Sequence, residues 1–240
     1  MNNVKMSLFG FLSKSVTLSE SCVCKGMVDC HSHLIPGVDD GIQKIEDSLA
    51  VLDLYEKLGM RELYCTPHIM EDFPNSSEKL KDRFAQLCDA YKGSIKLHLS
   101  AEYMIDNLLL QRLTEKDLLP HGVNGDHLLI ETSYYSSPGY FDEVVEKVRS
   151  IGLWPMLAHP ERYNYMEKDR YEELKSQGVK FQLNLPALLG RYGDDVKKKA
   201  SMLLSKGMYD FIGTDVHRFE PDLGQRKIRK SDVEHLMRMK

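Results

Sequence analysis

Short apolar segments that alternate with amphipathic helical segments constrain the fold of this chain most strongly. The segments that we expect to be strands are Met27–Cys30, Glu62–Thr66, Ile95–Ser100, His127–Glu131, Trp154–Ala158, Val179–Leu183 and Tyr209–Gly213. The expected helices are Ile42–Leu58, Ser77–Tyr91, Tyr140–Ile151, Tyr171–Gln177 and Asp194–Lys206. Strands that alternate with helices of this length form βαβ units. We therefore predict an α/β fold whose parallel sheet curls into a barrel that is incomplete or distorted.

The length and charge of the chain limit its organisation. A chain of 240 residues with 42% hydrophobic content can bury one large core. We expect a tail over residues 1–25 and one domain over residues 26–240. The formal net charge of −4 argues against a nucleic-acid partner, because such proteins usually carry a basic face.

Cysteine usage and hydropathy indicate the compartment. The five cysteines are an odd number and form no paired C-x-x-C zinc array, which fits a reduced, cytoplasmic setting. The apolar run Leu8–Leu12 lacks a following small-residue cleavage site. No segment approaches the roughly 18 apolar residues of a membrane span, so we expect no stable membrane insertion.

Imidazole and carboxylate residues follow the expected strands. They are His31 and His33 after the first strand, His68 after the second, Glu102 after the third, His159 after the fifth, and Asp215 and His217 after the last. In barrels of parallel strands, the active site gathers at the C-terminal ends of the strands. These side chains should therefore meet on one rim.

The types and spacing of these residues indicate metal binding. His31 and His33 are two apart on an extended segment, so their side chains point to one face and can share a metal. Asp29 is expected to orient one imidazole. Asp40 precedes a helix and could be its N-cap, but beside the other ligands metal binding is favoured, with Asp39 as the cap or loop residue.

Two further elements indicate phosphoester chemistry. Glu102 is the candidate for a carboxylate that bridges adjacent cations, an arrangement that recurs in phosphoester hydrolysis. Arg162 follows His159 by three residues. A surface ion pair is the default for an arginine, but beside a metal cluster its planar fork suits phosphate binding. The remaining histidines that we treat as structural or surface residues are His98, His121, His127 and His235.

These motifs resemble the PHP (polymerase and histidinol phosphatase) superfamily. The similarity is greatest to the manganese-dependent protein-tyrosine phosphatases encoded with bacterial capsule and exopolysaccharide genes. The segments that carry it are Asp29–Gly41, Thr66–His68, Ala101–Glu102, Leu129–Glu131, Ala158–Tyr163 and Gly213–His217, which span about residues 27 to 217.

The resemblance implies a distorted (β/α)7 barrel that holds three divalent ions, usually Mn²⁺, with Fe or Zn as substitutes. By matching position, the implied ligands are His31, His33, Asp40, His68, Glu102, His159, Asp215 and His217. Arg162 would be the catalytic arginine that holds the substrate phosphate. The implied substrate is phosphotyrosine on the tail of a bacterial tyrosine kinase that controls polysaccharide assembly, and a homo-oligomer is left open.

The chain departs from the pattern of this family in two places. Relatives often carry a second arginine a few residues after the final Asp-x-His, whereas here Arg218 is immediately adjacent and Arg226 lies nine residues on. Arg218 is our candidate for substrate binding. The chain also ends in a basic stretch from Arg226 to Lys230, where relatives usually continue through another helix.

Three alternatives to a tyrosine phosphatase remain. The same site could act on histidinol phosphate, another small phosphoester or a nucleotide. A metal-dependent amidohydrolase also starts with His-x-His, but such enzymes typically use a bridging lysine where Glu102 stands here. A catalytically silent binding module would use the metal only for shape, and the full set of expected ligands argues against it.

Overall fold

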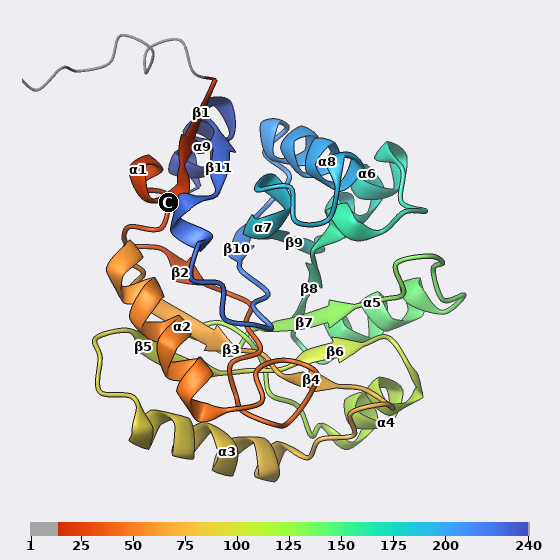
Figure 1. The fold of residues 1–240 in the computed structure, drawn as a ribbon. Coiled ribbons are helices and arrows are strands. Elements are labelled where there is room, and N and C mark those ends of the chain that lie inside the picture. The colour runs from red at the N-terminus through yellow and green to blue at the C-terminus, as the bar shows by residue number, and fades with distance from the viewer. Residues whose placement is uncertain (1–13, 240) are drawn as a thin grey trace, which may run out of the picture.

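A curled parallel sheet in two parts forms the centre of the fold (Figure 1). The computed structural model describes residues 14–239, so the apolar run Leu8–Leu12 lies outside the described residues. The six-stranded part has the order β10 (Phe211–Gly213), β9 (Lys180–Asn184), β8 (Trp154–Ala158), β7 (His127–Glu131), β6 (Glu102–Met104) and β4 (His68–Ile69). The three-stranded part has the order β2 (Val28–Asp29), β3 (Glu62–Cys65) and β5 (Lys96–Leu99). All neighbouring strands within these two parts are parallel, as predicted.

All seven predicted strands are present, and β4 and β6 are additional strands of the parallel sheet. Pro67 separates β3 from β4, because a proline has no N–H to donate to the ladder. After this break the chain continues in the six-stranded part, where His68 is in register with Glu102. Strands of two and three residues are too short to show periodicity in the sequence. The break therefore brings two predicted site residues next to each other.

The first and last strands of the sheet lie side by side. Cys30 N donates to Ile212 O at 2.9 Å, and Ser32 forms a parallel bridge with Val216. Buried Asp29 accepts from both N and Oγ1 of Thr214, at 2.8 and 2.6 Å. The segment that carries His31 and His33 is thus joined to the segment that carries Asp215 and His217 through backbone and side-chain hydrogen bonds.

The helices pack around the outside of the sheet (Figure 1). They are α2 (Ile45–Leu58), α3 (Ser77–Ala90), α4 (Asn107–Glu115), α5 (Phe141–Ser150), α6 (Lys168–Ser176), α7 (Leu185–Leu188) and α8 (Asp194–Ser205), with the 3₁₀ turns η2 (Pro160–Arg162) and η3 (Leu223–Gln225). The five predicted helices are confirmed with shifted ends, and α4 and the four-residue α7 are additional.

The first predicted helix begins at Ile45, not at Ile42. The residues before it form a loop in which Asp39 Oδ1 accepts from Gly41 N at 2.9 Å. This loop packs closely on His33, since a Cβ at Gly41 would lie 2.4 Å from His33 Cβ. Neither Asp39 nor Asp40 is an N-cap, because Lys44 occupies that position.

The described part of the expected tail packs against this same chain. Strand β1 (Ser15–Thr17) pairs antiparallel with β11 (Lys227–Arg229), beside α1 (Leu18–Ser21) and the C-terminal helix α9 (Lys230–Arg238), as Figure 1 shows. Val23 is fully buried. Residues 14–25 are therefore ordered by contacts that are distant in sequence, which local periodicity cannot reveal.

The helix α9 forms the C-terminal part of the described chain. We expected the chain to end soon after the basic stretch from Arg226 to Lys230, and this stretch leads directly into α9, which begins at Lys230 and whose Leu236 is fully buried. Within residues 14–239, no helix combines the length and the hydropathy needed to cross a membrane.

Candidate metal centre

Three overlapping groups of imidazoles and carboxylates lie at the C-terminal end of the sheet. The groups are His33, Asp40, His68 and His217; His31, His33, Glu102 and Asp215; and His68, Glu102 and Glu131. Within each group, the ligand atoms all lie within 4.8 Å of one another. The structure therefore brings together seven of the eight predicted ligands, from separate loops, and adds Glu131.

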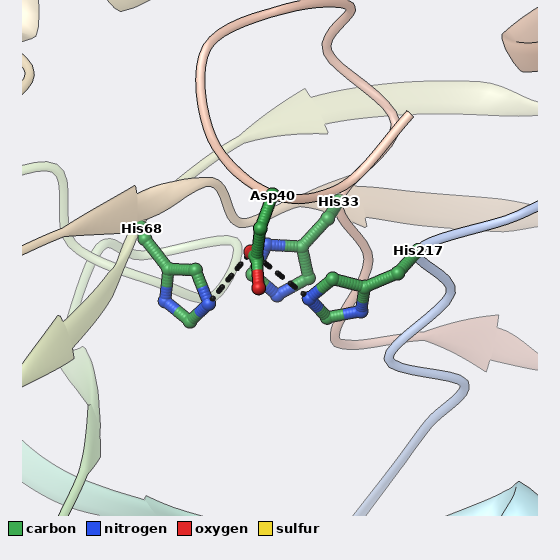
Figure 2. Close-up of side chains that lie close together, drawn as sticks. All are labelled: His33, Asp40, His68 and His217. Carbon is green, nitrogen blue, oxygen red and sulfur yellow. Dashed lines mark ion pairs between the residues drawn. The ribbon is translucent and has the colours of Figure 1, made fainter. Parts of the chain in front are cut away.

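Figure 2 shows the first group. The carboxylate of Asp40 lies between two imidazoles, with Oδ1 at 3.5 Å from His68 Nε2 and 3.4 Å from His217 Nε2. His33 and His217 stack, with ring centroids 4.0 Å apart. Asp40 is the exposed member of this group, with 59% of its side chain accessible, so the group opens toward solvent.

The second group is buried and consists of four atoms that accept hydrogen bonds. Gln182 Oε1 lies 2.9 Å from His31 Nδ1, and Asp39 Oδ2 lies 2.8 Å from His33 Nδ1. Each Nδ1 therefore donates, which in a neutral imidazole leaves Nε2 without a proton. These two Nε2 atoms are 3.1 Å apart and lie 3.1–3.4 Å from Glu102 Oε2 and Asp215 Oδ1. Four converging acceptors repel one another unless a metal cation or protons lie between them.

Glu102 connects the second group to the third. Its Oε2 lies 3.3 Å from His68 Nδ1, which is also 3.2 Å from Glu131 Oε1. His68 Nδ1 is buried and makes no hydrogen bond within residues 14–239. Glu131 ends β7 and was missed as a ligand, although it lies in one of the segments that carried the family resemblance.

His159 is the predicted ligand that belongs to none of the three groups. Its Nε2 lies 3.1 Å from Glu102 Oε1 and 3.8 Å from Glu131 Oε2, so it borders the cluster. Its Nδ1 is buried without a hydrogen-bond partner in the described chain. His159 and Asp215 both have left-handed backbone conformations, with φ of 33° and 51°. Such strain in non-glycine residues concentrates at functional sites.

The expected role of Asp29 is corrected. Its Oδ1 accepts from the backbone N of His31 at 3.2 Å, while the side chain otherwise binds Thr214, so Asp29 orients no imidazole. Gln182 and Asp39 orient the rings instead. No sequence motif indicated Gln182. Its amide reaches the ring of His31 only because β9, which carries Gln182, lies near the end of β2 in the fold.

The electrostatics of the cluster also favour a cation. Burial alone would lower the pKa of His31, but Glu102 and Asp215 more than offset this and raise it to about 9. Burial likewise opposes protonation of His33, and Asp39 and Glu102 raise its pKa well above the usual value. The carboxylates therefore attract positive charge, which metal ions supply in place of protons.

Arg162 lies beside the second group. Its Nη1 donates to Asp215 Oδ2 at 2.8 Å, and 19% of its side chain is accessible. Arg218 is exposed and lines a surface cleft together with Asp40 and His217. Arg226 pairs with Glu220 and Asp222. Of the two arginines that follow His217, Arg218 is therefore the one that lies beside the metal-binding groups.

The other histidines lie in different surroundings. His98 pairs with Glu62, His127 pairs with Asp126, and His121 lies against the carbonyl of Cys30. His235 is on α9. None of the four belongs to the three groups.

Known proteins share this fold. Tyrosine-protein phosphatase CpsB from Streptococcus agalactiae is 28% identical over 213 residues, which cover 81% of this chain and 84% of that protein. The crystal structures of YwqE from Bacillus subtilis and CpsB from Streptococcus pneumoniae, described as unique metal-dependent tyrosine phosphatases, give a TM-score of 0.74 at 23% identity, covering 88% of this chain and 86% of the matched chain.

A more distant structure is similar in fold. Histidinol phosphate phosphatase from Lactococcus lactis, complexed with zinc, L-histidinol and phosphate, gives a TM-score of 0.53 at 15% identity and covers 89% of this chain and 92% of that one. The family model for capsular polysaccharide synthesis, CpsB/CapC, matches residues 27–232. The chain therefore belongs to the CpsB/CapC family.

Proposed function

We propose that this protein is a metal-dependent phosphatase that hydrolyses phosphotyrosine on a protein. The observation that carries the proposal is the position of Arg162, whose guanidinium bonds to Asp215 at the edge of three groups of metal-binding side chains. A fork of N–H donors beside a cation cluster fits a phosphate dianion. The tyrosine-protein phosphatase names of the relatives support the same activity.

We propose three divalent ions, with Mn²⁺ as the native metal and Fe or Zn as substitutes, held by the eight predicted ligands and Glu131. Three overlapping groups of ligand atoms support this number. When bound, such ions lower the pKa of a bound water toward about 7 and neutralise charge on phosphoryl oxygens. Arg162 binds the phosphate, with Arg218 as a second contact from the exposed side.

The finer architecture and setting are also proposals. Seven strand segments, counting β3 with β4 and β5 with β6, support a distorted (β/α)7 barrel of the PHP type. We propose that residues 26–240 form one catalytic domain in the cytoplasm. The phosphorylated tail of a bacterial tyrosine kinase that controls capsule or exopolysaccharide synthesis is the proposed partner, which the family description supports. A homo-oligomer remains compatible with these features.

Hydrolysis of two substrates side by side tests the activity. With Mn²⁺ added, a phosphotyrosine peptide should be hydrolysed faster than histidinol phosphate, and a chelator should abolish both reactions. Hydrolysis of histidinol phosphate alone would replace the tyrosine assignment by the small-molecule alternative. No hydrolysis of either substrate or of p-nitrophenyl phosphate would contradict the phosphatase assignment.

A further inference from the structure

The guanidinium of Arg162 lies over two tyrosine rings, those of Tyr134 and Tyr192, which we call the clamp. Its Cζ lies 4.3 Å from the ring centroid of Tyr134 and 4.4 Å from that of Tyr192. Tyr134 is in the loop between β7 and α5, Arg162 ends η2, and Tyr192 is in the loop between α7 and α8. Three loops that are distant in sequence thus build one cation–π arrangement beside the metal-binding groups.

The clamp leaves the edge of the guanidinium available. Both ring centroids lie within 4.4 Å of its Cζ, and within residues 14–239 its one side-chain hydrogen bond is that from Nη1 to Asp215. The Nε and Nη2 donors have no protein acceptor in that part of the chain. The N–H donors of a guanidinium point outward in its plane, so these free donors can bind an anion at the edge of the group.

Both rings are themselves held in place. Asn184 Nδ2 donates to Tyr192 Oη at 3.1 Å and to Asp215 Oδ2 at 2.9 Å, so one amide links the ring to the carboxylate that Arg162 binds. Tyr134 packs near His159 and Tyr163, with ring centroids 5.7 and 6.0 Å away. The orientation of the clamp is therefore coupled to the cluster on both sides.

We propose that Tyr134 and Tyr192 are positioning residues that fix the plane of Arg162 for binding the substrate phosphate. The inference rests on the proposed phosphatase activity and assigns a role to two residues outside the predicted site. A long arginine side chain otherwise loses rotamer freedom when it binds phosphate. The rings remove that freedom before the substrate arrives.

The test compares variants that keep or remove the aromatic ring. Tyr134→Phe and Tyr192→Phe keep a ring over Arg162, whereas Tyr134→Leu and Tyr192→Leu keep apolar volume without one. We expect each leucine variant to raise the KM for p-nitrophenyl phosphate and the Ki for inorganic phosphate about tenfold, with little change in kcat. The phenylalanine variants should stay within about threefold of the unmodified protein.

Two controls separate positioning from a general structural effect. Tyr135 adjoins Tyr134 in the same loop but is 81% exposed, so Tyr135→Leu should leave both constants unchanged. In an Arg162→Ala background, Tyr134→Leu and Tyr192→Leu should have no further effect on the Ki for phosphate, because the group that they position is absent. Methionine, which is also apolar and not aromatic, replaces leucine where a leucine variant does not fold.

The outcomes distinguish this inference from the proposed function. If the unmodified protein hydrolyses p-nitrophenyl phosphate and the leucine variants bind phosphate as tightly as it does, the clamp has no positioning role. If the leucine effects persist unchanged in the Arg162→Ala background, the tyrosines act by another route and the inference is also overturned. An unmodified protein that is inactive with Mn²⁺ contradicts the phosphatase assignment. Calorimetric titration of the same variants with inorganic phosphate, which needs no turnover, then tests the clamp.

Discussion

Asp39 Oδ2 accepts a hydrogen bond from His33 Nδ1 at 2.8 Å and another from His68 N at 3.0 Å. This carboxylate therefore fixes the ring of one predicted ligand and the backbone of a second. Both of its oxygens accept hydrogen bonds, since Oδ1 binds Gly41 N. An amide in its place would direct an NH₂ group at one of these donors.

We therefore expect Asp39→Asn to weaken Mn²⁺ binding by about 10- to 100-fold, as substitutions of groups that orient metal ligands typically do. Calorimetric titration of the metal-free protein with Mn²⁺ measures the effect. Asp53→Asn, on the exposed face of α2, is the matched control and should bind Mn²⁺ normally. Equal affinity in the two variants would show that Asp39 does not support the site.

Arg162→Ala should lower phosphatase turnover by well over tenfold while the protein stays folded. A charge-assisted bidentate contact to phosphate is worth more than about 1.4 kcal/mol, which corresponds to a factor of ten in rate. Steady-state kinetics with p-nitrophenyl phosphate measure the loss. Arg149→Ala is the control. Arg149 also lies over an aromatic ring, that of Trp154, but belongs to none of the metal-binding groups, so this variant should retain full activity. Equal activities would remove Arg162 from the mechanism.

The strand ends could be predicted from the sequence because hydrophobic periodicity and chemistry coincide there. Seven apolar segments each end near a polar residue, and parallel strands direct those ends to one rim. His31, Glu102 and Asp215 could be grouped on this basis before any geometry was known. Nothing in local spacing shows which oxygen or nitrogen each ring faces.

Contacts between distant segments explain what the sequence did not reveal. Gln182 lies 151 residues from His31. Tyr134 and Tyr192 both reach Arg162 only because their loops lie on either side of it in the fold. The pairing of β1 with β11 also joins opposite ends of the chain. Such contacts depend on topology, which a single sequence specifies only through the complete fold.

Removal of the metal should destabilise the protein. The buried Nε2 atoms of His31 and His33 face each other and two carboxylates, so the cluster without cations must take up protons or suffer repulsion. A ligand that binds only the folded state stabilises it in proportion to the logarithm of its concentration. We expect the thermal unfolding midpoint to fall after chelation and to rise again with Mn²⁺.

Glu102→Gln is the variant that tests this explanation. It removes the carboxylate shared by two of the three groups and should strongly reduce the recovery with Mn²⁺. Elemental analysis of both proteins gives the metal bound per chain. An unfolding midpoint that is insensitive to chelator and to Mn²⁺, in a protein without bound metal, would contradict a metal centre at these residues.

Cys30 should not take part in the reaction, although it adjoins His31. Its thiol is buried, and burial raises its pKa well above the usual value, so it is not a thiolate at neutral pH. Cys30→Ala should therefore retain phosphatase activity, and treatment with iodoacetamide at neutral pH should leave the unmodified protein active. Loss of activity in both experiments would indicate a thiol nucleophile, as in phosphatases that do not use metals.

His121 should make stability depend on pH through burial. Its Nε2 donates to Cys30 O at 2.9 Å and its ring stacks on Tyr64 at 4.0 Å, while burial lowers the pKa of the imidazole to about 3. Unfolding returns this pKa to about 6.5. Between pH 3 and pH 6.5, the imidazole of residue His121 therefore binds a proton in the unfolded state but not in the folded state. The stabilisation is therefore complete above about pH 6.5 and is lost as the pH falls toward 3.

His121→Gln removes this titration. The difference in unfolding free energy between the unmodified protein and the variant should narrow below pH 6.5, by up to about 1.4 kcal/mol per pH unit. Urea denaturation at pH 7.5 and pH 5.5, with chelator present throughout, measures the difference. The histidines of the metal centre titrate in both proteins, so their contribution cancels. A difference that stays constant or widens as the pH falls would show that His121 is not held neutral in the folded protein.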